Sequence, residues 1–135
     1  MTLAKSNKLF AFALLFLVLF SACKKDKEEN ENPAGYWKGL YGSGTLSPSQ
    51  AYSVLFRPDG TARIYSQSSD TSTGPKAEGT YKVIGSTVTT NYTYFTGSIT
   101  GSFSTTSSSD GTEMAGTYGS GSATSGGGTF YLSKQ

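Results

Sequence analysis

The chain has 135 residues, of which 36% are hydrophobic and 15% charged, and this length accommodates one hydrophobic core rather than several domains. Its net charge of +2 comes from Lys5 and Lys8, because nine basic residues balance nine acidic ones from Cys23 onward. That balance argues against a nucleic-acid partner. Histidine is absent and Cys23 is the single cysteine, which excludes disulfide pairs, imidazole bases and His/Cys metal sites within the chain. We therefore expect no cofactor.

The first 22 residues have the three-part organisation of a secretory signal peptide. Two lysines precede an uninterrupted apolar run over residues 9–20, and two small residues follow it. A helix of that length would cover about 18 Å of a hydrocarbon layer that is about 30 Å thick. The segment 1–22 is therefore better explained as a signal peptide than as a membrane-spanning helix.

The segment Phe20-Ser21-Ala22-Cys23 resembles the lipobox of bacterial lipoproteins, with Phe at a position where Leu is commoner. The resemblance implies that Cys23 carries a thioether-linked diacylglycerol and an acylated amino group, so the membrane is an expected partner. At about 0.8 kcal/mol for each buried methylene, several acyl chains hold a small domain at a membrane almost permanently. The alternatives for Cys23 are a buried free thiol and an anchor that is not cleaved.

Residues 23–35 are expected to form the lipidated cysteine and a charged, flexible tether, because almost no side chain between Lys24 and Pro33 is apolar. Lys24 stands where Asp often retains lipoproteins in the inner membrane, which favours the bacterial outer membrane. The acidic residues behind the cysteine resemble a surface-export signal, and a merely hydrophilic spacer explains them equally well. The periplasmic face and the cell surface both remain open. The acidic residues are Asp26, Glu28, Glu29 and Glu31.

Residues 36–135 have the alternating apolar pattern of β-strands with one buried face, and no window shows a helical period. Pro58-Asp59-Gly60 and Gly85-Ser86 are typical of the tight turns that join antiparallel neighbours. The sequence therefore predicts an all-β domain. The expected strands are residues 36–41, 51–57, 61–65, 79–84, 87–95, 98–105, 113–118 and 129–133.

Eight short strands in sequence favour an antiparallel up-and-down meander, which loses its exposed edges by closing into a barrel. A two-sheet sandwich built from the same strands is the alternative. We expect the barrel, because every connection is short enough to join neighbouring strands, and we expect a monomer.

Four short motifs resemble the small bacterial lipocalin-like lipoproteins. Gly35-Tyr36-Trp37 is similar to the Gly-x-Trp opening of lipocalins, and residues 56–61, 79–81 and 128–132 match further strand and hairpin positions. The resemblance covers nearly the whole domain. It implies a calycin-type barrel whose base is closed by Trp37. The domain is shorter than a typical lipocalin and lacks an evident carboxy-terminal helix.

The residues argue against an enzyme. Without histidine, only solvated lysines could activate one of the many serines, and these should stay protonated. Asp59 and Asp110 precede turn glycines, and Glu78 and Glu113 lie at predicted strand starts, so a facing pair of catalytic carboxyl groups is not indicated. No spacing of acidic residues suggests a metal loop.

The aromatic residues are the remaining candidates for recognition, since a tyrosine offers both a flat apolar face and a hydroxyl. An eight-stranded barrel is just wide enough to hold one small ligand or to be filled by its own side chains. Two hypotheses follow: a binding module for a small hydrophobic or amphipathic molecule, or an envelope protein whose loops Ser66–Lys76 and Ser104–Thr112 contact a protein or a glycan. The candidate ligand-lining residues are Trp37, Tyr52, Val54, Phe56, Tyr81, Tyr92, Tyr94, Ile99, Phe103 and Met114.

Overall fold

The computed structural model describes residues 32–107 and 110–135. The signal peptide, Cys23 and the tether up to residue 31 lie outside these residues. Within the described ranges, no helix is long and apolar enough to span a membrane.

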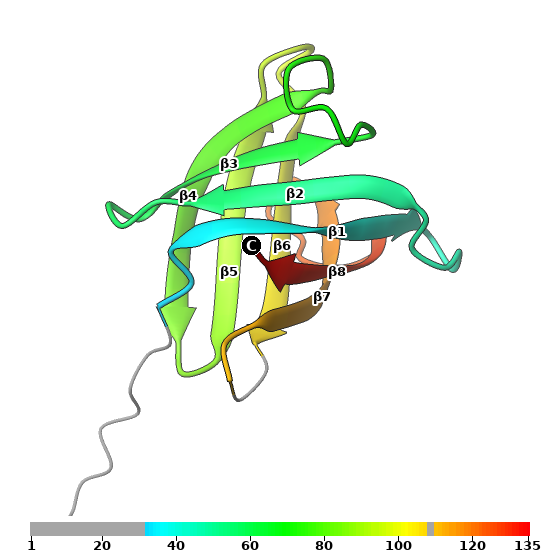
Figure 1. Ribbon diagram of the computed structural model, residues 1–135. Helices are drawn as coiled ribbons and strands as arrows, with labels where there is room; N and C mark the ends of the chain where they lie inside the picture. Colours follow the sequence, from blue (N-terminus) through cyan, green and yellow to red (C-terminus); the bar gives the residue numbers. More distant parts are fainter. Residues whose placement is uncertain (1–31, 108–109) are drawn as a thin grey trace, which may run out of the picture.

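Eight antiparallel strands form one closed up-and-down barrel, in which each strand pairs with its neighbours in the sequence (Figure 1). The predicted all-β barrel is confirmed, and the alternative of a two-sheet sandwich is wrong. The strands are β1 (Gly35–Ser43), β2 (Gln50–Phe56), β3 (Thr61–Ser66), β4 (Lys76–Ile84), β5 (Thr87–Tyr94), β6 (Thr100–Ser107), β7 (Glu113–Ser120) and β8 (Gly128–Lys134).

Pairing between β1 and β8 closes the barrel. Trp37 pairs with Lys134, Tyr41 with Phe130, and the ladder runs antiparallel over seven residue pairs. Because both edge strands are used in this ladder, no strand edge is left open to pair with another chain. The first strand of the domain, β1, and the last, β8, therefore each need the other as a pairing partner.

The predicted turns have the expected local chemistry. Gly60 adopts a φ of 84°, and its amide donates to the Arg57 carbonyl at 3.1 Å. The Asp59 carboxylate accepts hydrogen bonds from both the amide and the hydroxyl of Thr61. The pKa of Asp59 is lowered, first by the hydroxyl and then by the amide of Thr61. The role of Asp59 is thus to hold the β2–β3 turn.

The strands β4 and β6 differ from the predicted ones. β4 begins at Lys76 rather than at residue 79, and β6 covers Thr100–Ser107 rather than residues 98–105. Ser98 has a φ of 51°, which removes it from the strand and places it in the β5–β6 loop. β6 continues beyond Ser104 because it pairs with β7 as far as Ser107 opposite Met114, so the predicted loop Ser104–Thr112 starts too early.

Inward-facing positions alternate along each strand and bring aromatic rings into the centre of the barrel. Glycines stand beside the largest rings: Gly79 and Gly101 both pair with Tyr92, and Gly116 pairs with Phe130. A Cβ on Gly101 would lie 2.8 Å from the ring of Tyr92. The glycines therefore provide the space that the rings occupy.

Gly79 illustrates a second requirement, which is close approach of two backbones. A Cβ at this position would lie 1.9 Å from the carbonyl oxygen of Asn91 on β5. No side chain fits there without moving the strand. Glycine within a strand marks such a bend, and here it allows the sheet to curl into a barrel.

The closed end of the barrel, which carries the connections β2–β3, β4–β5 and β6–β7, is filled by side chains. Trp37 is only 1% exposed, and its indole Nε1 donates to the Pro33 carbonyl at 2.8 Å. Lys134 lies over the Trp37 ring, 5.5 Å from its centre. Phe56 packs edge-on against Tyr81 at 5.0 Å. These side chains fill the described interior of the barrel at this end.

Two buried threonines of the interior differ in hydrogen bonding. Thr105 Oγ1 donates to the Ala115 carbonyl at 2.9 Å. Thr90 Oγ1 is buried without a hydrogen-bond partner among the described residues. A buried hydroxyl without a partner costs free energy, whereas a paired one does not.

Substitution by valine should therefore change the free energy of unfolding in opposite directions at Thr90 and Thr105. We expect Thr90→Val to raise the free energy of unfolding by up to about 1 kcal/mol, because it replaces an unpaired hydroxyl with a methyl of similar shape. Thr105→Val should lower it by about 1 kcal/mol, because the Ala115 carbonyl loses its donor. Denaturant unfolding of both variants measures the difference. A clear loss of stability in Thr90→Val would contradict this account and indicate a bound internal water.

Candidate functional site

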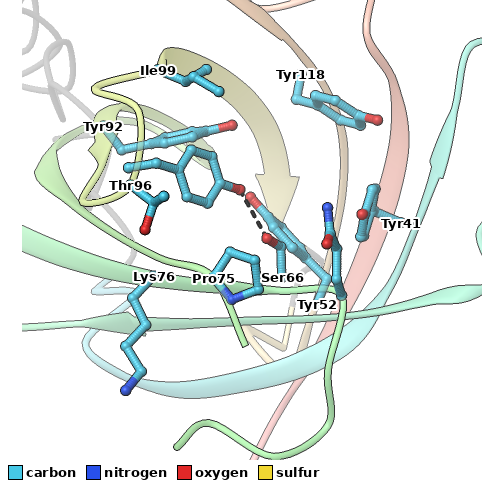
Figure 2. A pocket seen from close by; sticks show the side chains of 11 residues that line it. Tyr41, Tyr52, Ser66, Pro75, Lys76, Tyr92, Thr96, Ile99 and Tyr118 are labelled. Carbon is cyan, nitrogen blue, oxygen red and sulfur yellow. Dashed lines mark hydrogen bonds between the residues drawn. The ribbon is translucent and has the colours of Figure 1, made fainter. Parts of the chain in front are cut away.

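A cavity of about 320 Å³ lies at the end of the barrel opposite Trp37. This open end carries the longer loops, residues 44–49, 67–75, 95–99 and 121–127. The close-up in Figure 2 shows side chains from several of these elements around one space. The lining residues are Tyr41, Tyr52, Ser66, Gln67, Pro75, Lys76, Tyr92, Tyr94, Thr96, Ile99 and Tyr118.

Five tyrosines from four strands dominate the lining. Tyr41 is on β1, Tyr52 on β2, Tyr92 and Tyr94 on β5, and Tyr118 on β7. Each shares the inward face of its strand with core residues, because side chains on one face recur at every second position. Adjacent rings contact one another: Tyr41 lies 5.5 Å from Tyr52 and 5.9 Å from Tyr118, and Tyr92 lies 5.7 Å from Tyr94. The walls are thus a continuous aromatic surface.

Three of these hydroxyls donate to groups of the protein. Tyr41 donates to Gln50 Oε1 at 2.7 Å, and Tyr94 donates to Ser66 Oγ at 3.1 Å, the bond drawn in Figure 2. Tyr118 donates to the Gly42 carbonyl at 3.2 Å. These bonds hold the rings in position and leave the lone pairs of the hydroxyl oxygens as acceptors for a ligand.

Burial raises the pKa of four tyrosines that line the cavity. Desolvation raises the pKa of Tyr52 well above its ordinary value, and the hydroxyls of Tyr92 and Tyr94 raise it further. Desolvation likewise raises the pKa of Tyr92, Tyr94 and Tyr41. At neutral pH these side chains are therefore uncharged hydrogen-bonding groups and poor candidates for metal ligation or nucleophilic attack.

The β3–β4 loop forms one side of the cavity mouth. Gln67 has a φ of 64°, an uncommon conformation for a residue with a side chain. Its backbone amide donates to the Ala51 carbonyl at 3.0 Å. Gln67 lies in the cavity wall, and its side chain interacts with Tyr41. Residues in such conformations cluster at functional sites.

Four of the ten ligand-lining residues expected from the sequence lie around this cavity: Tyr52, Tyr92, Tyr94 and Ile99. Ile99 is 63% exposed and belongs to the β5–β6 loop rather than to a strand.

The other six do not line the cavity, because they face the filled part of the interior. Five are buried in the core, and Tyr81 is half-buried against Phe56, with its hydroxyl donating to the Arg57 carbonyl at 2.7 Å. The alternating pattern identifies inward-facing residues but does not distinguish a packed layer from a cavity wall. The five core residues are Trp37, Val54, Phe56, Phe103 and Met114.

Sequence reasoning missed Tyr41, Tyr118 and Gln67 among the lining residues. Tyr41 and Tyr118 lie an even number of positions from Trp37 and Met114, so period-two spacing could have placed both of them inside the barrel. No comparable signal exists for Gln67, since its position depends on the path of a loop.

The acidic residues for which the structure gives partners stand outside the cavity. Glu78 on the outer face of β4 binds Arg57 through two hydrogen bonds of 2.9 and 3.0 Å and also pairs with Arg63. The arginines lower the pKa of Glu78, Arg57 most strongly. The Asp70 carboxylate accepts from the amide and hydroxyl of Ser72 in its own loop. No cluster of three potential acidic or thiol metal ligands occurs among the described residues.

No protein-family model, curated protein or solved structure matches this chain. The residues and geometry of the cavity therefore carry the functional argument.

The buried tyrosines predict a loss of stability at alkaline pH. Because burial raises the pKa of these tyrosines in the folded state, the unfolded chain loses its tyrosine protons at a lower pH than the folded chain does. Their contribution to the free energy of unfolding is therefore fully present below about pH 10. It is lost as the pH rises through the folded-state pKa values. Each tyrosine contributes a slope of up to about 1.4 kcal/mol per pH unit.

Denaturant unfolding at increasing pH, together with the ultraviolet absorbance of tyrosinate, measures this effect. Tyr52→Phe should reduce the slope above pH ~10, because the most deeply buried hydroxyl is then missing. An unchanged slope in this variant would show that Tyr52 ionises equally in the folded and unfolded states.

Proposed function

We propose that this chain is a lipocalin-like lipoprotein, anchored at the bacterial outer membrane through Cys23, that binds a small amphipathic molecule without transforming it. The observation that carries the proposal is the tyrosine-lined cavity of about 320 Å³ at the open end of a barrel whose other end is filled. Ligand sites are typically concave, mostly apolar spaces with a few fixed polar groups, and the cavity has this character.

Binding rather than catalysis is supported by the chemistry of the lining. The described lining residues include no carboxylate and no thiol, and burial raises the pKa of the Tyr52 and Tyr92 hydroxyls further from neutral pH. The single ionisable amine is that of Lys76, whose Nζ donates to the Ser72 carbonyl at 3.2 Å. A hydrolytic or transfer reaction needs an activated nucleophile or a base, and these residues offer neither.

The geometry is compatible with attachment to a membrane through the amino terminus. β1 begins at the closed end of the barrel, so a lipid on Cys23 would join the domain at the end opposite the cavity. Cys23 and Gly35 are twelve positions apart in the sequence, a stretch that spans at most about 40 Å when extended. An anchored domain would thus keep its cavity accessible to molecules in the envelope.

A second candidate, an envelope protein that contacts a protein or glycan through its loops, is favoured by one observation. Leu46 is 70% exposed and Ile99 63% exposed, and both lie on loops of the open end. They stand on separate loops on opposite sides of the opening, and exposed apolar side chains around one end of a domain are found at interaction surfaces. Because the cavity opens among the same loops, ligand binding remains the better-supported function.

The anchor is tested by replacing Cys23. We expect Cys23→Ala to release the protein from the membrane fraction into the soluble fraction, because the thiol that accepts diacylglycerol is absent. Fractionation with intact-mass measurement detects both the release and the missing lipid mass. Wild-type protein whose intact mass begins at Met1 and includes no diacylglycerol would contradict the lipid anchor.

The ligand is tested by native mass spectrometry of protein extracted gently from its own membranes. We expect a stoichiometric organic molecule on the wild-type protein. Thr96→Trp should abolish its retention, because an indole on this exposed rim position would fill the cavity mouth. Thr93→Trp is the matched control, since Thr93 is exposed on β5 and does not line the cavity.

Wild-type protein that carries no ligand from any membrane extract would contradict the binding function. If the same empty protein crosslinked reproducibly to one envelope partner through its open-end loops, the second candidate would replace the first.

A further inference from the structure

The floor of the cavity is a layer of packed aromatic rings. Tyr52 packs against Phe130 at 5.4 Å, Tyr92 against Phe103 at 5.9 Å, and Phe103 against Phe130 at 5.1 Å. Both phenylalanines are essentially inaccessible to solvent. A long acyl chain would have to pass this layer, which the packed core prevents. The cavity, near the lower size limit of ligand pockets, therefore suits a compact molecule.

The walls favour a flat ring over an aliphatic group. The tyrosine rings meet one another at tilted or edge-to-face angles, between 57° and 86°. A further aromatic ring placed among them can adopt the same contacts, which are worth about 0.5–1.5 kcal/mol beyond the burial of its area. An aliphatic group of equal size gains only the burial.

The inside of the cavity holds no charge to neutralise an ion. Lys76 is the one cation among the described residues that line it, and Figure 2 shows the ammonium of Lys76 directed away from the labelled tyrosines. That ammonium is bonded to the Ser72 carbonyl and also interacts with Asp70. An organic anion would therefore lose its hydration without gaining a partner, at high cost.

The hydroxyls define the polar group that a ligand needs. The hydroxyls of Tyr41, Tyr94 and Tyr118 donate their protons to groups of the protein, so toward a ligand their oxygens act as hydrogen-bond acceptors. The hydroxyls of Tyr52 and Tyr92 interact with each other, and this pair offers protons to an acceptor on a ligand. A ligand hydroxyl can both donate and accept in this setting.

We infer that the cavity selects uncharged, flat, mono- or bicyclic molecules carrying a hydroxyl or carbonyl group, in preference to acyl chains and organic anions. This inference rests on the proposed binding function and specifies its ligand class. It assigns the apolar contacts to the tyrosine faces and the polar contact to the Tyr52–Tyr92 pair.

The test compares four probes of defined chemistry: naphthol, naphthalene, naphthoate and dodecanoate. Each is titrated by calorimetry into the full-length lipidated protein in lipid nanodiscs, with empty nanodiscs as the blank. We expect naphthol to bind one per protein, with naphthoate and dodecanoate at least about 10-fold weaker. Naphthalene should bind more weakly than naphthol by about 5- to 10-fold, the contribution of one hydrogen bond.

Tyrosine variants separate the polar contact from general packing. Tyr92→Phe should weaken naphthol by about 5- to 10-fold and leave naphthalene unchanged, because only the hydroxyl is removed. Tyr52→Phe, which removes the other hydroxyl of the pair, serves as a second variant if Tyr92→Phe fails to fold. Tyr131→Phe is the matched control, because Tyr131 lies on β8 and does not line the cavity; it should bind all probes as the wild type does.

Naphthoate or dodecanoate binding as tightly as naphthol, with displacement of naphthol, would overturn the ligand class and leave the binding function in place. Failure of naphthol to bind would also overturn the ligand class. The binding function itself is decided separately, by the molecule that the protein retains from its own membranes.

Discussion

Closure of the sheet between β1 and β8 is the constraint on which the interior depends. The ladder that joins Trp37 to Lys134 and Tyr41 to Phe130 determines which side chains face each other across the barrel. Once the edges are paired, every inward position must be filled by a side chain or left as a cavity. In this closed sheet, inward-facing side chains fill one end of the barrel and surround a cavity at the other.

Glycine and aromatic residues together fill the interior of this barrel. The domain has few aliphatic side chains, so rings supply most of the buried area. Rings are too large to stand on every strand at one level, and glycines such as Gly101 beside Tyr92 provide the missing space.

The chemistry of the cavity follows from burial as well as from residue type. Nine tyrosines are distributed over the chain. Two of those around the cavity, Tyr41 and Tyr94, are held by Gln50 and Ser66, and desolvation raises the pKa of both. The charged residues Arg57, Glu78 and Arg63 pair on the outer surface instead. The protein thus separates its ionic contacts from its aromatic interior, and recognition of uncharged molecules is consistent with that separation.

The sequence by itself determined the class of fold, most strand positions and the turn at Asp59-Gly60, because alternation and turn chemistry are local properties. It also placed Tyr52 and Tyr92 inside the barrel. Only the tertiary structure decided that Phe56 and Phe103 belong to the packed core whereas Tyr41 and Tyr118 surround a cavity. The depth of a residue depends on strand register and tilt, and a cavity wall joins residues from strands and loops that are far apart in the chain.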